Sequence, residues 1–323
     1  MAEGVVRRGL VVRKHLGEYL VESDDRVFVC SPSNILRKDL VYFDPASERP
    51  TGRALGVAEI TDVDPVAVGD DVIFLEGAEG AGLIKEVLPR RNELTRAAAG
   101  RAPRRQVIVA NVDQVVAIVA VARPDPNWQL LDRLLVTVEA ADIPAVVCFT
   151  KLDLADDFPE ADVYRGVGYR TVLTSVVTGE GVGELADLLA GKISVLVGMS
   201  GVGKSSLLNT IEPGLGLRVA AVSEASRKGR HTTTHLEMHT LSNGGRVVDT
   251  PGVKYFGLWG IAAGDAQLLF PELRGRFGRC RFNDCRHLDE PNCAVKEGLR
   301  TGELAASRYD SYLAILQSVR PQH

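Results

Sequence analysis

Residues 198–206 read G-M-S-G-V-G-K-S-S, which fits the phosphate-loop pattern G-x-x-x-x-G-K-[ST] at every fixed position. The apolar run at 193–197 ends directly before this stretch and is typical of a buried strand in a parallel sheet. A helix is expected to begin at Lys204. Backbone N–H groups and the positive end of the helix dipole converge on such a loop, so that it holds phosphate groups. The stretch therefore predicts an α/β nucleotide-binding domain.

Every position of this loop is a candidate nucleotide contact. The ammonium of Lys204 is expected to reach the β- and γ-phosphates, and the hydroxyl of Ser205 is expected to ligate Mg²⁺. The complete predicted set is Gly198, Met199, Ser200, Gly201, Val202, Gly203, Lys204, Ser205 and Ser206. A glycine-rich turn without a ligand is the alternative, and the flanking strand and helix argue against it.

The length, composition and net charge of the chain limit the class of protein it can belong to. The chain has 323 residues, 45% of them hydrophobic, which is enough for two or three domains. Its longest apolar run, 115–122, is far shorter than the ~20 residues of a membrane helix, and its first ten residues lack a signal-peptide core. We therefore expect a cytoplasmic protein without membrane contact. The net charge of −4 argues against a generally basic nucleic-acid binder, so that any RNA contact must come from local patches.

The N-terminal part, 1–88, consists of short alternating apolar runs separated by turns. This pattern predicts a small β-barrel, with an oligonucleotide-binding (OB-type) barrel as the leading candidate and a β-domain that acts only as a spacer as the alternative. Residues 89–105 are expected to form a linker that carries a local cationic strip. The strip contains Arg90, Arg91, Arg96, Arg101, Arg104 and Arg105 against the single acid Glu93. It is either a solvated linker or a contact for RNA phosphates, and we favour the contact.

From 106 to 260 the pattern changes to alternating strands and helices, including helices at 128–140 and 182–189 and a strand at 145–149. This strand ends at Thr150-Lys151-Leu152-Asp153, which suits recognition of a guanine base. Asp153 can accept two hydrogen bonds, from guanine N1 and N2, that adenine cannot make. The stem of Lys151 is expected to pack along the base. A surface lysine and aspartate pair is the alternative.

Two further stretches complete the predicted nucleotide site. The strand at 171–175 ends where Ser175 and the Val176 backbone can meet guanine O6. The basic, glycine-containing stretch 227–234 reads as a switch segment in which Thr232 or Thr233 completes the Mg²⁺ shell, or alternatively as a solvated loop.

The stretch 246–252 is a strand ending in a D-x-x-G element. There Asp249 holds magnesium through water, and the N–H group of Gly252 detects the γ-phosphate. Ser205 and Asp249 are thus the predicted magnesium contacts. In an ordinary GTP-binding fold the phosphate loop comes first and the guanine motif fourth, but here the guanine motif precedes the loop. The domain at 106–260 is therefore predicted to be circularly permuted, which close termini make sterically acceptable.

The C-terminal part, 261–323, contains the spacing Cys280-x₄-Cys285-x-His287-x₅-Cys293. Three sulfurs and one imidazole form a complete tetrahedral set for zinc without an open position, which predicts one structural zinc in a small, mostly helical domain. Buried free thiols are the alternative. A last helix is expected at 303–316. A second basic patch surrounds the cluster and contains Arg274, Arg276, Arg279, Arg281 and Arg286. Cys30 and Cys148 lie in apparent strands and are expected to be core residues.

With these marks in this order, the sequence resembles the circularly permuted, ribosome-small-subunit-dependent GTPases that act in 30S biogenesis. The resemblance covers essentially all of the chain; Met199 and Ala97 depart from the common pattern. It implies a multidomain protein that hydrolyses GTP to GDP, with 30S subunits and 16S rRNA as partners and with stimulation by the subunit. We expect a monomer. Val253 stands where a water-orienting glutamine is usual, and the resemblance suggests His231 as the catalytic substitute. Alternatively, His231 contacts RNA.

Two other functions stay open at the level of sequence. The chain could be a GTPase that serves a different RNA, which the barrel and the zinc-binding tail do not exclude. It could also be a nucleotide-gated binding module with little catalysis, since the usual glutamine is absent after the D-x-x-G element.

Overall fold

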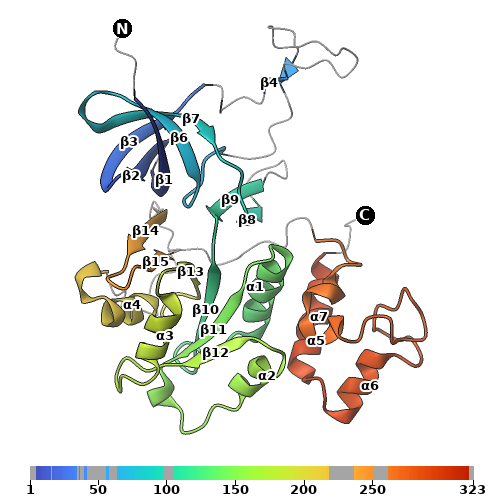
Figure 1. The fold of residues 1–323 in the computed structure, drawn as a ribbon. Helices are drawn as coiled ribbons and strands as arrows, with labels where there is room; N and C mark the ends of the chain where they lie inside the picture. Colours follow the sequence, from blue (N-terminus) through green and yellow to red (C-terminus); the bar gives the residue numbers. More distant parts are fainter. Residues whose placement is uncertain are drawn as a thin grey trace, which may run out of the picture. The chain divides into compact units, whose positions relative to one another are not determined.

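The structure is a computed structural model of the whole chain. It describes residues 5–15, 17–34, 36, 40–41, 56–57, 64–97, 105–217, 236–249 and 261–319. The chain divides into two compact units (Figure 1). The first unit comprises Met1–Val112 with Thr233–His239, and the second comprises Asp113–Thr232 with Thr240–His323. The helical C-terminal part therefore belongs to the same unit as the nucleotide-binding sheet.

The first unit contains the predicted barrel, which is closed by five strands. The barrel strands are β1 (Val6–His15), β2 (Glu18–Ser23), β3 (Arg26–Pro32), β6 (Asp71–Glu76) and β7 (Ala81–Val87). Strand β1 pairs with both β2 and β6, β3 pairs in parallel with β7, and β6 pairs with β7, so that the sheet closes on itself. Strand β14 (Leu236–Thr240) adds to β1. A short pair, β4 (Leu40–Val41) and β5 (Gly56–Val57), and the 3₁₀ turn η1 (Ala78–Gly80) complete the elements.

The barrel interior is filled by side chains that alternate along its strands. Phe28 and Phe74 meet there with ring centroids 5.1 Å apart, and the Cys30 side chain is fully buried beside them. A Cβ atom at Gly82 would lie 2.5 Å from the Cys30 Sγ, so that only glycine fits at this position. Burial raises the pKa of the Cys30 thiol to about 11, which agrees with the prediction of a plain core residue.

The segment expected to be a linker contains regular structure. Strand β8 (Glu93–Ala97) pairs with β9 (Arg105–Ala110). Before it, the Arg90 guanidinium donates to the fully buried Asp70 carboxylate over 2.7 and 2.8 Å. Burial alone would lower the pKa of Arg90, but Asp70 and Glu93 together raise it. Arg90 therefore stabilises the fold and is not available to RNA, while Arg101 and Arg104 lie outside the described residues.

The second unit contains a parallel sheet in the order β12-β11-β10-β13-β15 (Figure 1). Its strands are β10 (Gln114–Ala120), β11 (Ala145–Thr150), β12 (Arg170–Leu173), β13 (Ile193–Val197) and β15 (Arg246–Asp249). The helices connected to them are α1 (Trp128–Ala140), η2 (Leu152–Leu154), α2 (Glu160–Gly166), α3 (Val182–Leu189), α4 (Lys204–Ile211) and η3 (Pro213–Leu215). The predicted helices at 128–140 and 182–189 are confirmed with the same bounds, and Cys148 is buried as predicted.

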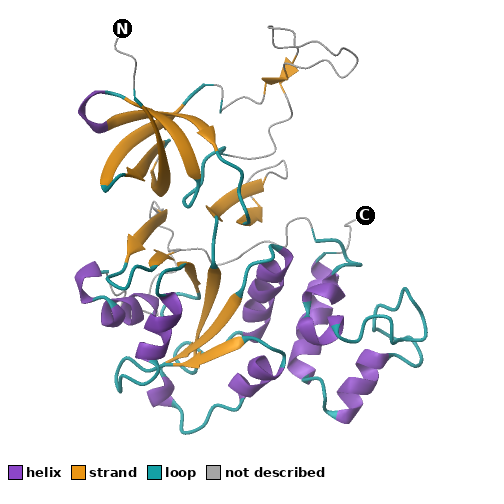
Figure 2. Ribbon diagram, in the orientation of Figure 1, coloured by secondary structure: helices purple, strands orange, loops and turns teal. Residues whose placement is uncertain are grey.

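The C-terminal part of this unit is helical, as predicted, and packs on α1 (Figure 2). It contains η4 (Ala266–Leu269), α5 (Pro271–Arg274), α6 (Ala294–Thr301) and α7 (Ala306–Ser318). Phe270, Tyr312 and Ile315 share one apolar cluster with Val136 of α1. The last helix begins three residues later than the sequence predicted, because Ala305 keeps an extended backbone with φ −70° and ψ 130°. None of the helices in the described part of the chain is long and apolar enough to cross a membrane.

A buried ionic cluster joins α7 to α1 and α5. Arg308 of α7 is 1% exposed and contacts Asp132 of α1, and its Nε donates to Glu272 Oε1 over 2.7 Å. The hydroxyl of Tyr164 donates to the same Asp132 carboxylate over 3.0 Å. Burial alone would lower the pKa of Arg308, but the charges of Asp132 and Glu272 raise it. Because one guanidinium pairs with two carboxylates here, removing the cation would leave buried anions unpaired.

Arg308→Ala is predicted to lower the free energy of unfolding by about 3–5 kcal/mol, the usual cost of breaking a buried ion pair. Arg300→Ala is the matched control, because its partner Glu297 and Arg300 itself are both exposed on α6. Denaturant titration of both variants would measure the difference. Two equally small losses would show that the Arg308 cluster does not hold the helices together.

Candidate functional site

The phosphate loop lies between β13 and α4, as its sequence predicts, and its glycines are required by the local geometry. A Cβ atom at Gly198 would lie 2.3 Å from the Ile118 carbonyl oxygen of the neighbouring β10. Gly201 and Gly203 have φ angles of 83° and 99°, in the left-handed region that favours glycine. The helix begins at Lys204. The loop is therefore wrapped tightly over the end of the sheet, with a helix N-terminus behind it.

The ammonium group of Lys204 lies against this loop. Its Nζ donates to the carbonyl oxygens of Gly198 and Met199 over 2.8 and 3.1 Å. Burial lowers the pKa of Lys204, and the carboxylate of Asp249 opposes this effect. Asp249 ends β15, which runs parallel to β13 with Leu196 opposite Asp249. An ammonium and a carboxylate thus lie at the end of the loop strand, as expected for groups that handle phosphate and a divalent cation.

The guanine motif ends β11 and is hydrogen-bonded to the phosphate loop. The hydroxyl of Thr150 donates to the Val202 carbonyl oxygen over 2.5 Å. The Nζ of Lys151 donates to the Gly201 carbonyl oxygen over 2.7 Å and also to the Arg123 carbonyl oxygen. Lys151 adopts the left-handed backbone, with φ 62°, which turns the chain sharply at the strand end. Two motifs that lie about fifty residues apart in the sequence therefore meet side by side.

The third predicted stretch, after β12, joins this arrangement through Asp153. The hydroxyl of Ser175 donates to Asp153 Oδ1 over 2.5 Å, while the backbone N–H groups of Val177 and Thr178 each donate to the Ser175 hydroxyl oxygen over 3.2 Å. These hydrogen bonds hold the Ser175 hydroxyl in place, and the hydroxyl in turn orients one oxygen of the exposed Asp153 carboxylate. The Val176 side chain is exposed next to it. The carboxylate keeps its second oxygen for another donor.

The carboxyl ends of β11, β12, β13 and β15 thus carry the side chains that the sequence predicts to contact a base, phosphates and a cation. Because these strands are parallel, their carboxyl ends lie along one edge of the sheet, where nucleotides bind in open α/β folds. Leu152 lies on the motif turn, and its N–H group donates to the Thr174 carbonyl oxygen over 3.1 Å. Ser205 and Ser206 lie in the first turn of α4, and the predicted residues His231, Thr232, Thr233 and Gly252 lie outside the described residues.

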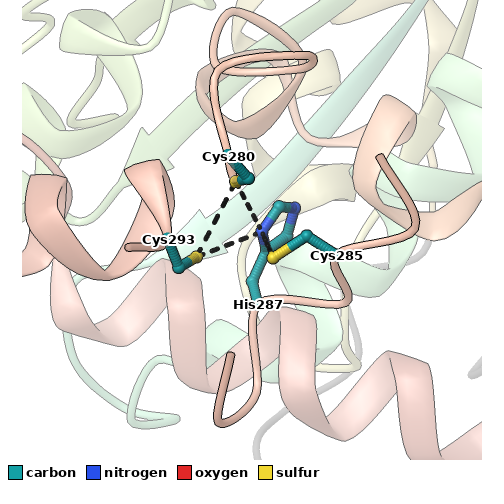
Figure 3. Close-up of side chains that lie close together, drawn as sticks. All are labelled: Cys280, Cys285, His287 and Cys293. Atoms are coloured by element: carbon teal, nitrogen blue, oxygen red, sulfur yellow. Dashed lines mark hydrogen bonds between the residues drawn. The ribbon is translucent and has the colours of Figure 1, made fainter. Parts of the chain in front are cut away.

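The predicted metal ligands form a compact cluster (Figure 3). The Sγ atoms of Cys280, Cys285 and Cys293 lie 3.6, 3.4 and 3.3 Å from His287 Nδ1, and the Cys280 and Cys293 sulfurs are 3.9 Å apart. In a tetrahedral zinc site, neighbouring ligand atoms lie roughly 3.5–3.8 Å apart, given bonds of about 2.0 Å to nitrogen and 2.3 Å to sulfur. Burial raises the pKa of the Cys285 thiol to about 12, so that a thiolate there needs a cation beside it. The donor set therefore fits zinc.

Sequence reasoning missed the residue that orients the imidazole. Gln267 Oε1 lies 2.8 Å from His287 Nε2, so that Nε2–H can donate to the amide while Nδ1 keeps its lone pair for the cluster. The Tyr309 hydroxyl donates to the His287 carbonyl oxygen and fixes the same turn. Gln267 lies twenty residues before its partner on another element, and no motif marks it in the sequence.

The chain was compared with known proteins. A family model described as RsgA GTPase matches residues 87–259. The small ribosomal subunit biogenesis GTPase RsgA of Gemmatimonas aurantiaca is 44% identical over 255 residues, which cover 77% of this chain and 83% of that protein. The protein of the same name from Moorella thermoacetica is 39% identical over 315 residues, which cover 96% of this chain and 97% of that protein.

Two solved structures share the fold. The crystal structure of YjeQ from Thermotoga maritima has a TM-score of 0.70 and 32% identity, covering 99% of this chain and 100% of that one. YloQ, described as a circularly permuted GTPase, has a TM-score of 0.68 and 30% identity, covering 100% of this chain and 99% of that one. Because the family model covers more than half of the chain and relatives match it almost from end to end, the chain belongs to the RsgA GTPase family and is a GTP hydrolase with a circularly permuted domain.

Proposed function

We propose that this GTPase binds the small (30S) ribosomal subunit through its 16S rRNA and acts in late maturation of the subunit. Its curated relatives are named for small ribosomal subunit biogenesis and match nearly the whole chain. The observation that carries the proposal is the direct contact between the guanine motif and the phosphate loop, through Thr150 and Lys151. A factor that binds the subunit at one stage and then leaves it needs a nucleotide site that can switch between two states. Because the proposed partner is a subunit under assembly, we place the protein in the cytoplasm.

The site residues take the following roles in this proposal. The guanine base lies against the stem of Lys151, with N1 and N2 at the Asp153 carboxylate that Ser175 orients and with O6 at Ser175 and the Val176 backbone. The phosphates lie on the loop from Gly198 to Ser206, where loop N–H groups and Lys204 hold negative charge. Mg²⁺, when bound, supplies further positive charge beside the transferred phosphoryl group. Ser205, Asp249 and either Thr232 or Thr233 hold that cation directly or through water.

Hydrolysis also needs a group that orients the attacking water. Val253 cannot do this because its side chain has no polar atom. We assign the role to His231, whose imidazole can accept a hydrogen bond and a proton near neutral pH. Gly252 senses the γ-phosphate through its N–H group. Contact with the subunit positions His231 for this role, so that hydrolysis is slow in the free protein and faster on the 30S particle.

The cysteine and histidine cluster holds one structural zinc in the proposal. Four ligands complete the tetrahedron and leave no position for a substrate. Three of the four ligands are buried and the cluster packs against Tyr309 and Tyr312. The metal therefore fixes the loops between α5 and α6 rather than taking part in hydrolysis.

Asp153→Asn is predicted to lower the affinity for GTP by about 100-fold or more, because two hydrogen bonds to a charged acceptor are lost. Xanthosine triphosphate should bind the variant better than the wild type, since its base carries an oxygen that the new amide can bind. Asp156→Asn, an exposed acid three residues further on, is the control and should bind GTP normally. Titration calorimetry with both nucleotides would measure this. Unchanged GTP affinity in Asp153→Asn would contradict the assigned base site.

The purified chain is predicted to contain one zinc ion, measurable by mass spectrometry of the metal. Cys285→Ser should abolish binding, and Gln267→Ala should weaken it about 10–100-fold by freeing the imidazole. Cys148→Ser removes a thiol outside the cluster and should keep the ion. A protein that folds identically without zinc would refute a structural role.

Small subunits are predicted to raise the GTP turnover of the wild type, whereas large subunits and tRNA should leave it unchanged. His231→Ala should lose most of the stimulated turnover but keep its GTP affinity, with His239→Ala of β14 as the control. Stimulation by another RNA alone would favour a different partner. Background turnover at saturating 30S would favour a nucleotide-gated binding module. Equal loss of GTP binding in His231→Ala would make that residue structural.

A further inference from the structure

The metal cluster is preceded by a five-residue repeat. The sequence R-F-x-x-C occurs at 276–280 and again, immediately after it, at 281–285. Each copy therefore places a phenylalanine three residues before a cysteine of the cluster: Phe277 before Cys280, and Phe282 before Cys285. Neither the nucleotide site nor the metal set uses these two side chains.

Both phenylalanines lie in solvent. Phe277 is 56% exposed and Phe282 is 41% exposed, whereas the other described phenylalanines are buried or half-buried. Local turns hold them there, because Phe277 N–H donates to the Arg274 carbonyl oxygen and Cys285 N–H donates to the Phe282 carbonyl oxygen. Exposure of two phenyl rings opposes the hydrophobic effect. Two exposed rings on one short loop mark a contact surface.

Unpaired positive charge surrounds these rings. Arg279, Arg281 and Arg286 are exposed, and none of them forms an ion pair within the described part of the chain. The Arg281 guanidinium carbon lies 5.5 Å from the centroid of the Phe282 ring, in cation–π contact. Arg274 and Arg276 differ, because Glu139 and Glu303 pair with them. Three free cations and two planar aromatic rings thus share one short loop.

We infer that Phe277 and Phe282 stack on unpaired RNA bases while Arg279, Arg281 and Arg286 contact the adjacent phosphates. Aromatic rings next to cations are the combination by which proteins bind single strands without strict sequence preference. In a duplex the base faces are already stacked and the rings would find no partner. Arginines alone would suit any anionic surface, and the exposed phenyl rings select the nucleic acid. This inference rests on the proposed function, in that the RNA belongs to the small subunit, and it specifies an unpaired segment there.

The test uses full-length protein with a single-stranded oligouridine, an RNA duplex of equal length, and 30S subunits. Alanine at either phenylalanine is expected to weaken oligouridine binding about tenfold, the usual loss of one base stack. Tyrosine at the same positions should retain the affinity, because the ring remains, and leucine should behave as alanine. Duplex affinity should not change. In Phe282→Trp, oligouridine should quench fluorescence beyond the change seen with the wild type, which reports stacking at this loop itself.

Zinc content is measured for every variant, so that loss of the loop is not mistaken for loss of a stack. If alanine disturbs the metal, the comparison of leucine with tyrosine carries the test. Arg279→Gln should reduce the slope of log affinity against log salt concentration by about one, the contribution of one phosphate contact. The phenylalanine variants should leave this slope unchanged.

The outcomes separate this inference from the proposed function. Full retention of oligouridine and 30S affinity by the double alanine variant would overturn the stacking surface. Leucine variants that bind 30S like the wild type would also overturn it, in favour of an apolar contact with a protein. Failure of the wild type to bind 30S subunits, together with ring-dependent oligouridine binding, would defeat the proposed partner and leave the stacking surface standing.

Discussion

Hydrogen bonds from Thr150 and Lys151 to the carbonyl oxygens of Val202 and Gly201 tie the guanine motif to the phosphate loop. They link two strand ends that lie on either side of β10 in the sheet. Gly198 permits the close approach that this requires, because any side chain there would collide with the Ile118 carbonyl. The predicted base and phosphate motifs are therefore in direct contact at the sheet edge, although they follow one another in reversed order along the chain.

Local sequence patterns predicted the helices and strands that depend on interactions between residues close in sequence. The apolar runs, glycines and helical periodicity were sufficient for β13, α1 and α3, and the ligand spacing was sufficient for the cysteine and histidine set. Contacts between distant side chains could not be predicted in this way. Arg90, which was expected in a linker, is half-buried and pairs with the fully buried Asp70 carboxylate.

The same limit applies to the C-terminal part of the chain. Gln267 orients His287 from another element, and Arg308 meets Asp132 across 176 residues of sequence. Neither pair leaves a signal in the segments around it, because only the tertiary fold brings the partners together. Chemical type was still informative: a buried arginine or imidazole needs a partner, but the sequence does not say which one.

The region around the cysteine and histidine cluster packs on helix α1 of the GTPase domain. Helix α1 follows β10, the strand beside the loop strand, and α7 lies against α1 through the Arg308 cluster. The exposed Phe277 and Phe282 are thus carried by the same compact unit that contains the nucleotide site. Within that unit, the RNA contact that we infer at the metal loop and the nucleotide site that we propose at the sheet edge would act on one continuous set of packed elements.

The central claim is that two motifs in reversed order form one GTP site at the carboxyl edge of the sheet. A crystal structure with Mg²⁺ and a non-hydrolysable GTP analogue tests it most directly. The account predicts the guanine N1 and N2 at the Asp153 carboxylate and the phosphates on the N–H groups of residues 198–206. A bound analogue whose base lies away from Asp153 and Ser175, with its phosphates still on the loop, would contradict it.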